Sequence, residues 1–167
     1  MEDIFNEYLI KRLPRPSDYL NKFGIGVAAI VIMALGFMYA GMLVILIIAG
    51  VGYGVYFLFK RFDIEYEYIL TNDELDVDKV IARESRKHLL TVKVTDFEIL
   101  APMTEEYKNE YSQTSIMKKI DVSSSAKSPK RMFAVYGAGK DRTLLIFEPP
   151  QKMLNGIKTF IPRRVKS

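Results

Sequence analysis

The order of apolar and polar positions divides the chain into two unlike parts. From Phe23 to Phe59 the sequence contains no Asp, Glu, Lys, Arg, His, Asn or Gln. One helix over this run would be about 55 Å long, whereas the hydrocarbon core of a bilayer is about 30 Å thick. Two shorter helices fit better, with a break at Ala40-Gly41, where glycine weakens a helix near the middle of the run. The sequence therefore predicts a transmembrane helical hairpin over 23–59, with helices at about 23–39 and 42–59.

The apolar run also has to be weighed as a signal peptide, a buried helix or a single span. A cleavable signal peptide has a short charged start and an apolar stretch of about 7 to 15 residues. This run begins only at Phe23 and is far longer. A buried helix of a soluble protein would need a larger core than the rest of the chain provides. A single long, tilted span stays open as the alternative.

From Asp63 onward the helical pattern gives way to the alternation that is typical of strands. The predicted strands are 64–71, 75–81, 89–94 and 97–100, separated by the turn pair Asn72-Asp73 and by a polar turn at 83–87. Aromatic and branched side chains are frequent in these stretches. We expect four antiparallel strands in a meander.

The next part of the chain begins with a polar stretch. Residues 104–130 predict a long, partly mobile excursion from the sheet, with a weak strand signal at 116–122. A β-hairpin over 131–136 and 143–147 then surrounds the glycine-containing turn at 137–140.

A helix closes the sequence. After Pro149-Pro150, apolar residues recur at helical spacing from Met153 to Ile161, and Pro162 ends the pattern. About seven short strands followed by a helix that plugs one open corner are the pattern of a pleckstrin-homology-like (PH-like) barrel. The predicted fold class is therefore an α+β membrane protein, with a two-helix transmembrane hairpin and a PH-like antiparallel β-barrel or sandwich at 62–162.

Particular stretches of the sequence also resemble those of known bacterial membrane proteins. The join of a short membrane hairpin to EYEYILTNDELDVDKVIARESRKHL resembles bacterial membrane proteins with PH-like domains. Together with FEIL, KSPKRMFAVYGAGKDRTLLIFEPPQKML and FIPRRV, nearly the whole chain resembles a family of small bacterial membrane proteins of unknown function. The resemblance implies the fold and no particular reaction.

Residues 1–22 predict an N-terminal amphipathic helix that lies at the membrane interface. The apolar residues at helical spacing are Ile4, Phe5, Tyr8 and Leu9, and charged residues occupy the other faces. Pro14 and Pro16 end this helix, and Ser17 can cap a new turn that leads into the first span. A helix that binds a partner is the alternative.

Charge refines the picture. The net charge is +4 and the pI about 9.1, yet 24 basic residues stand against 20 acidic ones. The basic residues that flank the apolar run are Lys11, Arg12, Arg15, Lys22, Lys60 and Arg61. By the positive-inside rule we expect a multi-pass protein of the cell membrane with both termini cytoplasmic. The basic residues beside the apolar run account for the net positive charge, so no nucleic-acid partner is expected.

Small residues in the apolar run are candidates for packing between the two helices. Gly50 and Gly54 form a small-xxx-small pair, and Gly36 and Ala40 lie near one face of the first helix. The alternative is that glycine is simply common in transmembrane helices.

The polar part offers few groups for chemistry. Asn72, Glu74, Asp76 and Asp78 alternate along a strand, but they lack the central glycine and final glutamate of a calcium loop, so a solvated face is expected. Gly139-Lys140 lacks the other residues of a phosphate loop. His88 is the single histidine, and the chain has no cysteine. We therefore expect no enzyme, no cofactor and no metal site.

Two basic clusters remain as candidates for contact with anionic lipid headgroups. One is the turn with Arg83, Arg86 and Lys87, and the other is the basic tail at 163–167, with Arg163, Arg164 and Lys166. Simple solvation of a turn is the alternative.

The expected function is that of a non-enzymatic, membrane-anchored PH-like module. It would serve protein–protein interaction or self-assembly at the cytoplasmic face, through edge strands or the 104–130 excursion. Its partners would be the lipid bilayer and either another protein or a second copy. Binding of anionic headgroups by the basic turn and tail is the alternative function.

Overall fold

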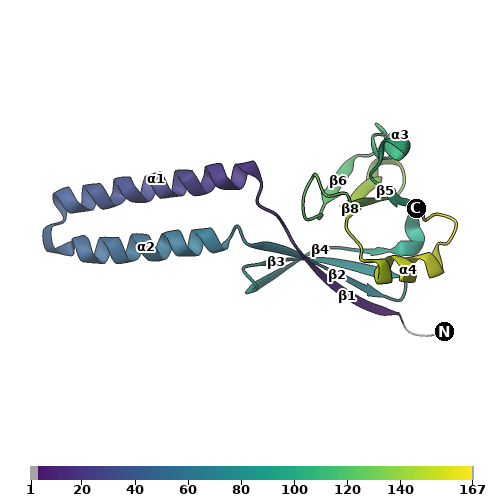
Figure 1. Cartoon of the computed structure of the whole chain (residues 1–167), viewed down its shortest axis with the longest axis horizontal. Helices are drawn as coiled ribbons and strands as arrows, with labels where there is room; N and C mark the ends of the chain where they lie inside the picture. The colour runs from purple at the N-terminus through teal and green to yellow at the C-terminus, as the bar shows by residue number, and fades with distance from the viewer. Residues whose placement is uncertain (1–3, 167) are drawn as a thin grey trace.

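A long helical hairpin projects from a body made of two β-sheets and a C-terminal helix (Figure 1). The computed structural model describes residues 4–166, apart from the side chain of Lys140. The hairpin and the body meet at one end of the first sheet, so the molecule is elongated.

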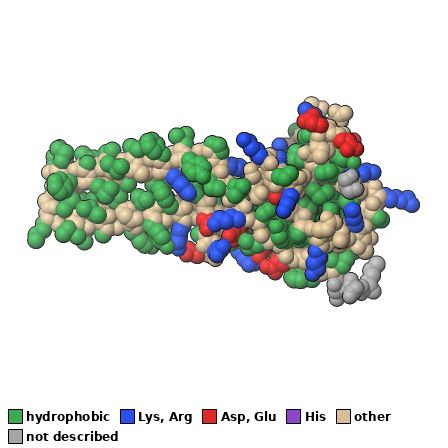
Figure 2. Space-filling model, in the orientation of Figure 1, with side chains coloured by type: hydrophobic (Ala, Val, Ile, Leu, Met, Phe, Trp, Pro, Cys, Tyr) green, Lys and Arg blue, Asp and Glu red, His purple; other side chains and the backbone are tan. Residues whose placement is uncertain are grey.

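The hairpin consists of α1 (Pro16–Tyr39), the short turn η1 (Gly41–Leu43) and α2 (Val44–Lys60). The predicted break is confirmed, because α1 is capped at Ala40 and Gly41 has a φ of +52°, a left-handed conformation that favours glycine. Both helices are long and apolar enough to cross a membrane, and the rest of the chain covers almost none of their surface. Figure 2 shows apolar side chains over the length of the hairpin.

Sheet A contains four antiparallel strands in the order β1-β2-β3-β4. These are β1 (Phe5–Lys11), β2 (Ile64–Thr71), β3 (Glu74–Ile81) and β4 (Ser85–Lys93). The predicted strands at 64–71, 75–81 and 89–94 are confirmed, although β4 starts earlier than expected.

The prediction of an N-terminal amphipathic helix is wrong, because residues 5–11 form the edge strand β1. Its register with β2 places Tyr8 opposite Tyr68, with the rings 6.3 Å apart, while Ile10 packs on the main core. The apolar residues of this segment fit either period, and pairing with β2 decides in favour of the strand.

Sheet B contains the remaining strands in the order β5-β7-β8-β6. These are β5 (Phe97–Pro102), β6 (Lys118–Asp121), β7 (Met132–Tyr136) and β8 (Thr143–Phe147). The four-strand meander is wrong in its last step, because the turn η2 (Val94–Asp96) carries the chain out of sheet A and β5 pairs with β7. The weak strand signal at 116–122 is confirmed as β6, which lies parallel to β8.

The two sheets face each other without closing into a barrel, and the described residues form eight strands rather than about seven. We call the face of sheet A toward sheet B its inner face and the opposite one its outer face. The helix α4 (Gln151–Phe160) covers one end of the core, where Met153 and Ile157 are fully buried. Fully buried aromatic side chains between the sheets include Tyr68 and Phe147, whose rings meet edge to face.

The 104–130 excursion is partly ordered by contacts with sheet B. It contains η3 (Glu105–Tyr107) and α3 (Lys108–Tyr111), and the ring of Tyr111 packs against buried Phe133. Farther along, the buried carboxylate of Glu148 accepts hydrogen bonds from Ser124 and Ser128. The turn η4 (Gly139–Asp141) joins β7 and β8.

Candidate functional site

The base of the hairpin grows directly out of sheet A. β1 leads into α1 and α2 leads into β2, and because β1 and β2 are neighbours, both ends of the hairpin leave from the same end of the sheet (Figure 1). The Arg12 N–H donates to the Ile64 carbonyl at 2.9 Å, and Lys11 Nζ lies 2.6 Å from Asp63 Oδ1. The flanks of the two helices are therefore held together on one side of the hairpin.

A buried ion pair fixes the start of α1. Arg12 Nη2 lies 2.8 Å from Asp18 Oδ2, and both side chains are almost fully buried. The same carboxylate oxygen accepts a hydrogen bond from the Arg15 N–H, which caps the helix. Removing one member of a buried pair costs about 3–5 kcal/mol, because the other charge stays uncompensated. The pair therefore constrains how the helix leaves the sheet.

Three cations lie on aromatic rings where the apolar surface of the hairpin ends. Lys22 Nζ is 5.5 Å from the centroid of Phe62, Lys60 Nζ is 5.1 Å from that of Tyr56, and the Arg61 guanidinium is 5.0 Å from that of Phe57. We call Lys22, Lys60 and Arg61 the basic collar. Amphipathic aromatic and basic side chains of this kind suit the headgroup level of a bilayer.

The turn between β3 and β4 lies next to the collar. The Ala82 N–H donates to the Asp63 carbonyl at 2.8 Å, and the Glu84 carboxylate forms an ion pair with Lys60. Ala82 and Arg83 have φ values of +54° and +58°, a conformation that costs about 1–2 kcal/mol for residues other than glycine. These contacts hold the strained turn, so the predicted cluster of Arg83, Arg86 and Lys87 lies at the hairpin end of sheet A.

Arg83 and Arg86 are not free cations, because each lies over a buried carboxylate on the outer face of sheet A. Arg83 Nη2 is 3.3 Å from Glu65 Oε1, and Arg86 Nη2 donates to Glu67 Oε1 at 3.0 Å. The glutamate side chains are 4% and 1% exposed, whereas those of the arginines are 74% and 62% exposed. The guanidinium groups thus cover the carboxylates and still face solvent.

Sequence reasoning missed these two glutamates. Their alternation in the stretch from Glu65 to Glu67 indicates a solvated strand face, and no local signal marks them as buried. Their arginine partners are two strands away, and the register between β3 and β4 shifts at a bulge between Val77 and Asp78. Only that register shows which arginine meets which carboxylate.

Glu67 lies where its surroundings oppose a negative charge. Burial raises the pKa of this carboxyl, the neighbouring carboxylate of Glu7 raises it further, and Arg86 lowers it. Its Oε2 is 3.0 Å from Arg86 Nη1 but accepts no hydrogen bond from any residue that the structure describes. A local excess of negative charge therefore lies beside β1.

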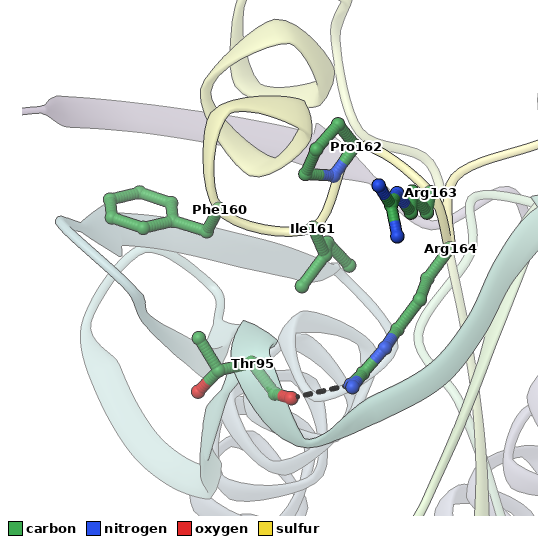
Figure 3. A pocket seen from close by; sticks show the side chains of 6 residues that line it. All are labelled: Thr95, Phe160, Ile161, Pro162, Arg163 and Arg164. Carbon is green, nitrogen blue, oxygen red and sulfur yellow. Dashed lines mark hydrogen bonds between the residues drawn. The ribbon is translucent and has the colours of Figure 1, made fainter.

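The basic tail lies at the other end of the body. Figure 3 shows Arg164 turned toward Thr95, whose carbonyl accepts a hydrogen bond from Arg164 Nη1 at 2.8 Å. The same nitrogen donates to the Phe97 carbonyl, and the Lys166 N–H donates to the Leu100 carbonyl. The tail is thus bound along β5, and Arg163 lines a cavity of about 300 Å³ beside it.

The two predicted headgroup clusters are separated by the length of β4. This strand has nine residues, which corresponds to about 30 Å, and it starts beside the basic turn and ends shortly before Thr95. The structure therefore brings the basic turn together with the collar and does not bring Arg163, Arg164 or Lys166 near either.

The small residues of the hairpin differ in their contacts. A methyl group at Gly36 would lie 3.1 Å from two carbons of Ile47, so the helices approach closely there, one helical turn before Ala40 ends α1. A methyl group at Gly50 or Gly54 would meet no atom within 4 Å. Gly54 instead lines an apolar cavity of about 240 Å³ between the helices.

His88 takes part in a polar chain on the outer face of sheet A. Its Nδ1 is 2.8 Å from Asp78 Oδ1, and its Nε2 is 3.2 Å from Thr91 Oγ1. The Thr91 hydroxyl donates to Asp76, so its proton is already committed to a carboxylate. Within residues 4–166, no three His, Cys, Asp or Glu side chains are grouped so that they could hold a metal ion.

Comparison with known proteins gives one family. A family model described as "Bacterial PH-like domain (DUF6106)", a domain of unknown function, matches residues 2–167. No curated protein and no solved structure gives a significant match to the chain.

Proposed function

The chain belongs to the family of bacterial PH-like domains, and from that premise we propose that it is a non-enzymatic docking module held at the cytoplasmic face of the cell membrane. The observation that carries the proposal is the apolar hairpin, which the body leaves uncovered and which extends from one end of sheet A. PH-like folds often mediate interactions, and the body offers strand edges for this purpose.

Insertion of the hairpin into lipid is supported by its surface. α2 has 17 residues, about 25 Å, and its large apolar side chains are exposed along its length. An apolar surface of this extent needs lipid or a partner to cover it. The basic collar lies at the base, where Lys and Arg favour the cytoplasmic side. Because β1 and β2 pair with each other, both ends of the hairpin then lie on the cytoplasmic side, together with the whole body.

Labelling in intact cells tests this topology. The natural chain has no cysteine, so single cysteines can be placed at exposed Lys166 and at Met42, which is 94% exposed at the tip of the hairpin. We expect a membrane-impermeant maleimide to leave Lys166→Cys unlabelled until the cells are lysed. It should reach Met42→Cys from outside. Labelling of Lys166→Cys in intact cells would overturn the proposed orientation.

Docking of a protein is tested by photo-crosslinking in cells. A photoreactive residue is placed singly on three strand edges, at Leu9 in β1, Lys87 in β4 and Lys119 in β6, each of which is exposed. The β5 edge is already occupied by the tail, through a bridge between Leu100 and Val165. A discrete adduct from at least one edge supports docking, and no adduct from any of the three would overturn it.

A second candidate, binding of anionic lipid headgroups, is favoured by one specific contact. The ion pair between Glu84 and Lys60 holds the basic turn beside the collar. Arg83, Arg86 and Lys87 would then extend the positive surface at headgroup level, where each such residue contributes about 1 kcal/mol toward an anionic membrane. The tail residues are not part of this site, because β4 separates them from the hairpin.

Lipid retention by the full chain tests the second candidate. The protein in mild detergent is titrated with phosphatidylglycerol or phosphatidylcholine, and bound lipid is counted by native mass spectrometry. We expect a preference for phosphatidylglycerol that falls by up to about 100-fold in the variant R83Q/R86Q/K87Q, because three lost contacts of about 1 kcal/mol each sum to about 3 kcal/mol. The control R163Q/K166Q should keep the preference. An equal loss in both variants would contradict the assignment.

A further inference from the structure

β1 presents an open backbone edge. The Arg12 N–H bonds to the Ile64 carbonyl and the Asn72 N–H to the Ile4 carbonyl, so in this antiparallel pair the even-numbered residues of β1 bond to β2. The N–H and C=O groups of the odd-numbered residues point away from the sheet. These residues are Phe5, Glu7, Leu9 and Lys11. The next odd-numbered N–H, that of Leu13, is already bonded to the Ser124 carbonyl.

The other long edge of sheet A is protected in a way that β1 is not. β4 carries Arg86 and Lys87, and its pairing with β3 is interrupted by a bulge. Charges and bulges are the usual means by which proteins discourage pairing at an edge. β1 also carries charges, Glu7 and Lys11, but its pairing with β2 has no bulge. β1 instead exposes Phe5 and Leu9, which are 60% and 44% exposed. Its edge is therefore the one suited to receive another strand.

On the outer-face side of this edge, Glu7 is the carboxylate that no ion pair compensates within the described chain, because Arg86 lies over Glu67 and Lys11 pairs with Asp63. Glu7 is exposed between Phe5 and Leu9, and Leu9 lies opposite Glu67 in the register. Glu67 is 1% exposed and one of its carboxylate oxygens accepts no hydrogen bond within the described chain. A cation beside Glu7 would relieve the repulsion between these two carboxylates.

The inner-face side of the same edge is a groove whose apolar walls are interrupted by Lys130, Arg131 and Gln151. A cavity of about 530 Å³ lies beside Tyr8, bounded by Pro102 and Met132 of sheet B and by Pro150 and Leu154 at the start of α4. It lies at the corner where the two sheets do not close. Because successive side chains of a strand point to opposite faces, an added strand would place every second side chain here.

We propose that the β1 edge binds an extended segment of another membrane protein, antiparallel to β1, with Lys or Arg beside Glu7 and apolar side chains in the groove at Tyr8. Main-chain hydrogen bonds to the odd-numbered residues hold the segment, and the alternation of basic and apolar side chains selects it. The inference rests on the proposed docking function and names the surface and the class of partner.

The direction of β1 excludes the β1 of a second copy as this partner. β1 runs toward the hairpin, so an antiparallel β1 from another copy would send its own hairpin away from the shared membrane (Figure 1). A segment that has just left the transmembrane helix of a different protein runs away from the membrane, antiparallel to β1. Such cytoplasmic segments are rich in Lys and Arg, which matches the negative charge at Glu7.

Amide exchange with a synthetic probe tests the inference. The full chain in nanodiscs of zwitterionic phosphatidylcholine, which has no net charge, is mixed with a peptide of about eight residues that alternates Lys and Val. We expect exchange at Phe5, Glu7, Leu9 and Lys11 to slow at least tenfold, with little change at Tyr8, which is already bonded to β2. A matched peptide that alternates Glu and Val should have no effect. No protection, or equal protection by both peptides, would overturn the proposal.

Three variants keep the test independent of misfolding. Leu9→Pro removes only an outward N–H and should abolish protection, whereas Leu9→Ala keeps that donor and should retain it. Glu7→Lys should reverse the preference in favour of the acidic peptide, a gain that an unfolded protein cannot show. Binding that survives Leu9→Pro would overturn strand addition.

The crosslinking experiment separates this inference from the docking function. Adducts from Lys87 or Lys119 without any from Leu9 would overturn the proposed surface and leave docking itself intact. Adducts from Leu9, together with protection by the basic peptide, support both.

Discussion

Glu67 illustrates at the scale of one residue how the body accommodates charge. Its carboxylate is buried on the outer face of sheet A, where Arg86 opposes and Glu7 reinforces the unfavourable effect of burial. The folded chain therefore holds a proton on this group more tightly than the unfolded chain does.

The sign of the resulting pH dependence follows from the raised pKa. The stability that protonated Glu67 contributes is fully present below pH 4.5, the ordinary pKa of a glutamate carboxyl. It is lost as the pH rises through the higher pKa that this group has in the folded state. We expect Glu67→Gln to flatten this decline above pH 4.5. Thermal unfolding of the full chain in nanodiscs measures it, with the exposed Glu74→Gln as control. An unchanged slope in Glu67→Gln would show that another group is responsible.

At the scale of elements, the sequence predicted correctly those helices and turns that depend on the residues within a short stretch of the chain. The break at Ala40-Gly41, the hairpin of β7 and β8 and the helix α4 follow from an apolar run, turn residues and helical spacing. β1 was missed because its apolar positions fit two periods, and only β2, more than fifty residues later, selects one of them.

Long-range pairing also explains what sequence analysis could not supply about the candidate sites. The departure of β5 from sheet A at the buried residue Val94 depends on the strand that receives it. The separation of Arg164 from Arg83 depends in turn on that topology. Their positive charge made both clusters candidates for headgroup contact, and only the structure shows that the length of β4 lies between them.

The contact between Gly36 and Ile47 supports a prediction for the hairpin. Gly36→Val would place side-chain atoms where the nearest Ile47 carbons are 3.1 Å from a methyl group. We expect a loss of about 1–3 kcal/mol in stability, typical of overpacking. Gly50→Ala, which meets open space, should be tolerated, and Ile47→Ala should partly rescue Gly36→Val. Thermal denaturation in detergent measures all three, and equal effects at Gly36 and Gly50 would contradict the packing described.

For the whole molecule, the decisive feature is that the hairpin is inserted between two neighbouring strands of one sheet. A short Gly/Ser linker in place of 16–60 should therefore leave sheet A intact, because β1 and β2 still pair. We expect this variant to be soluble and folded, with dispersed amide resonances. Deletion of 1–62 removes β1 as well and should give a less stable body. A linker variant that stays with the membrane would show that the hairpin is not the anchor.

The insertion also sets the order of events during synthesis. β1 leaves the ribosome first, yet its hydrogen-bonding partner does not exist until both helices have followed. If lipid takes up the helices as they emerge, β2 is delivered to β1 at the bilayer surface. The body would then be completed only after the helices have entered the lipid, and each copy would already lie at the bilayer when its sheet A formed.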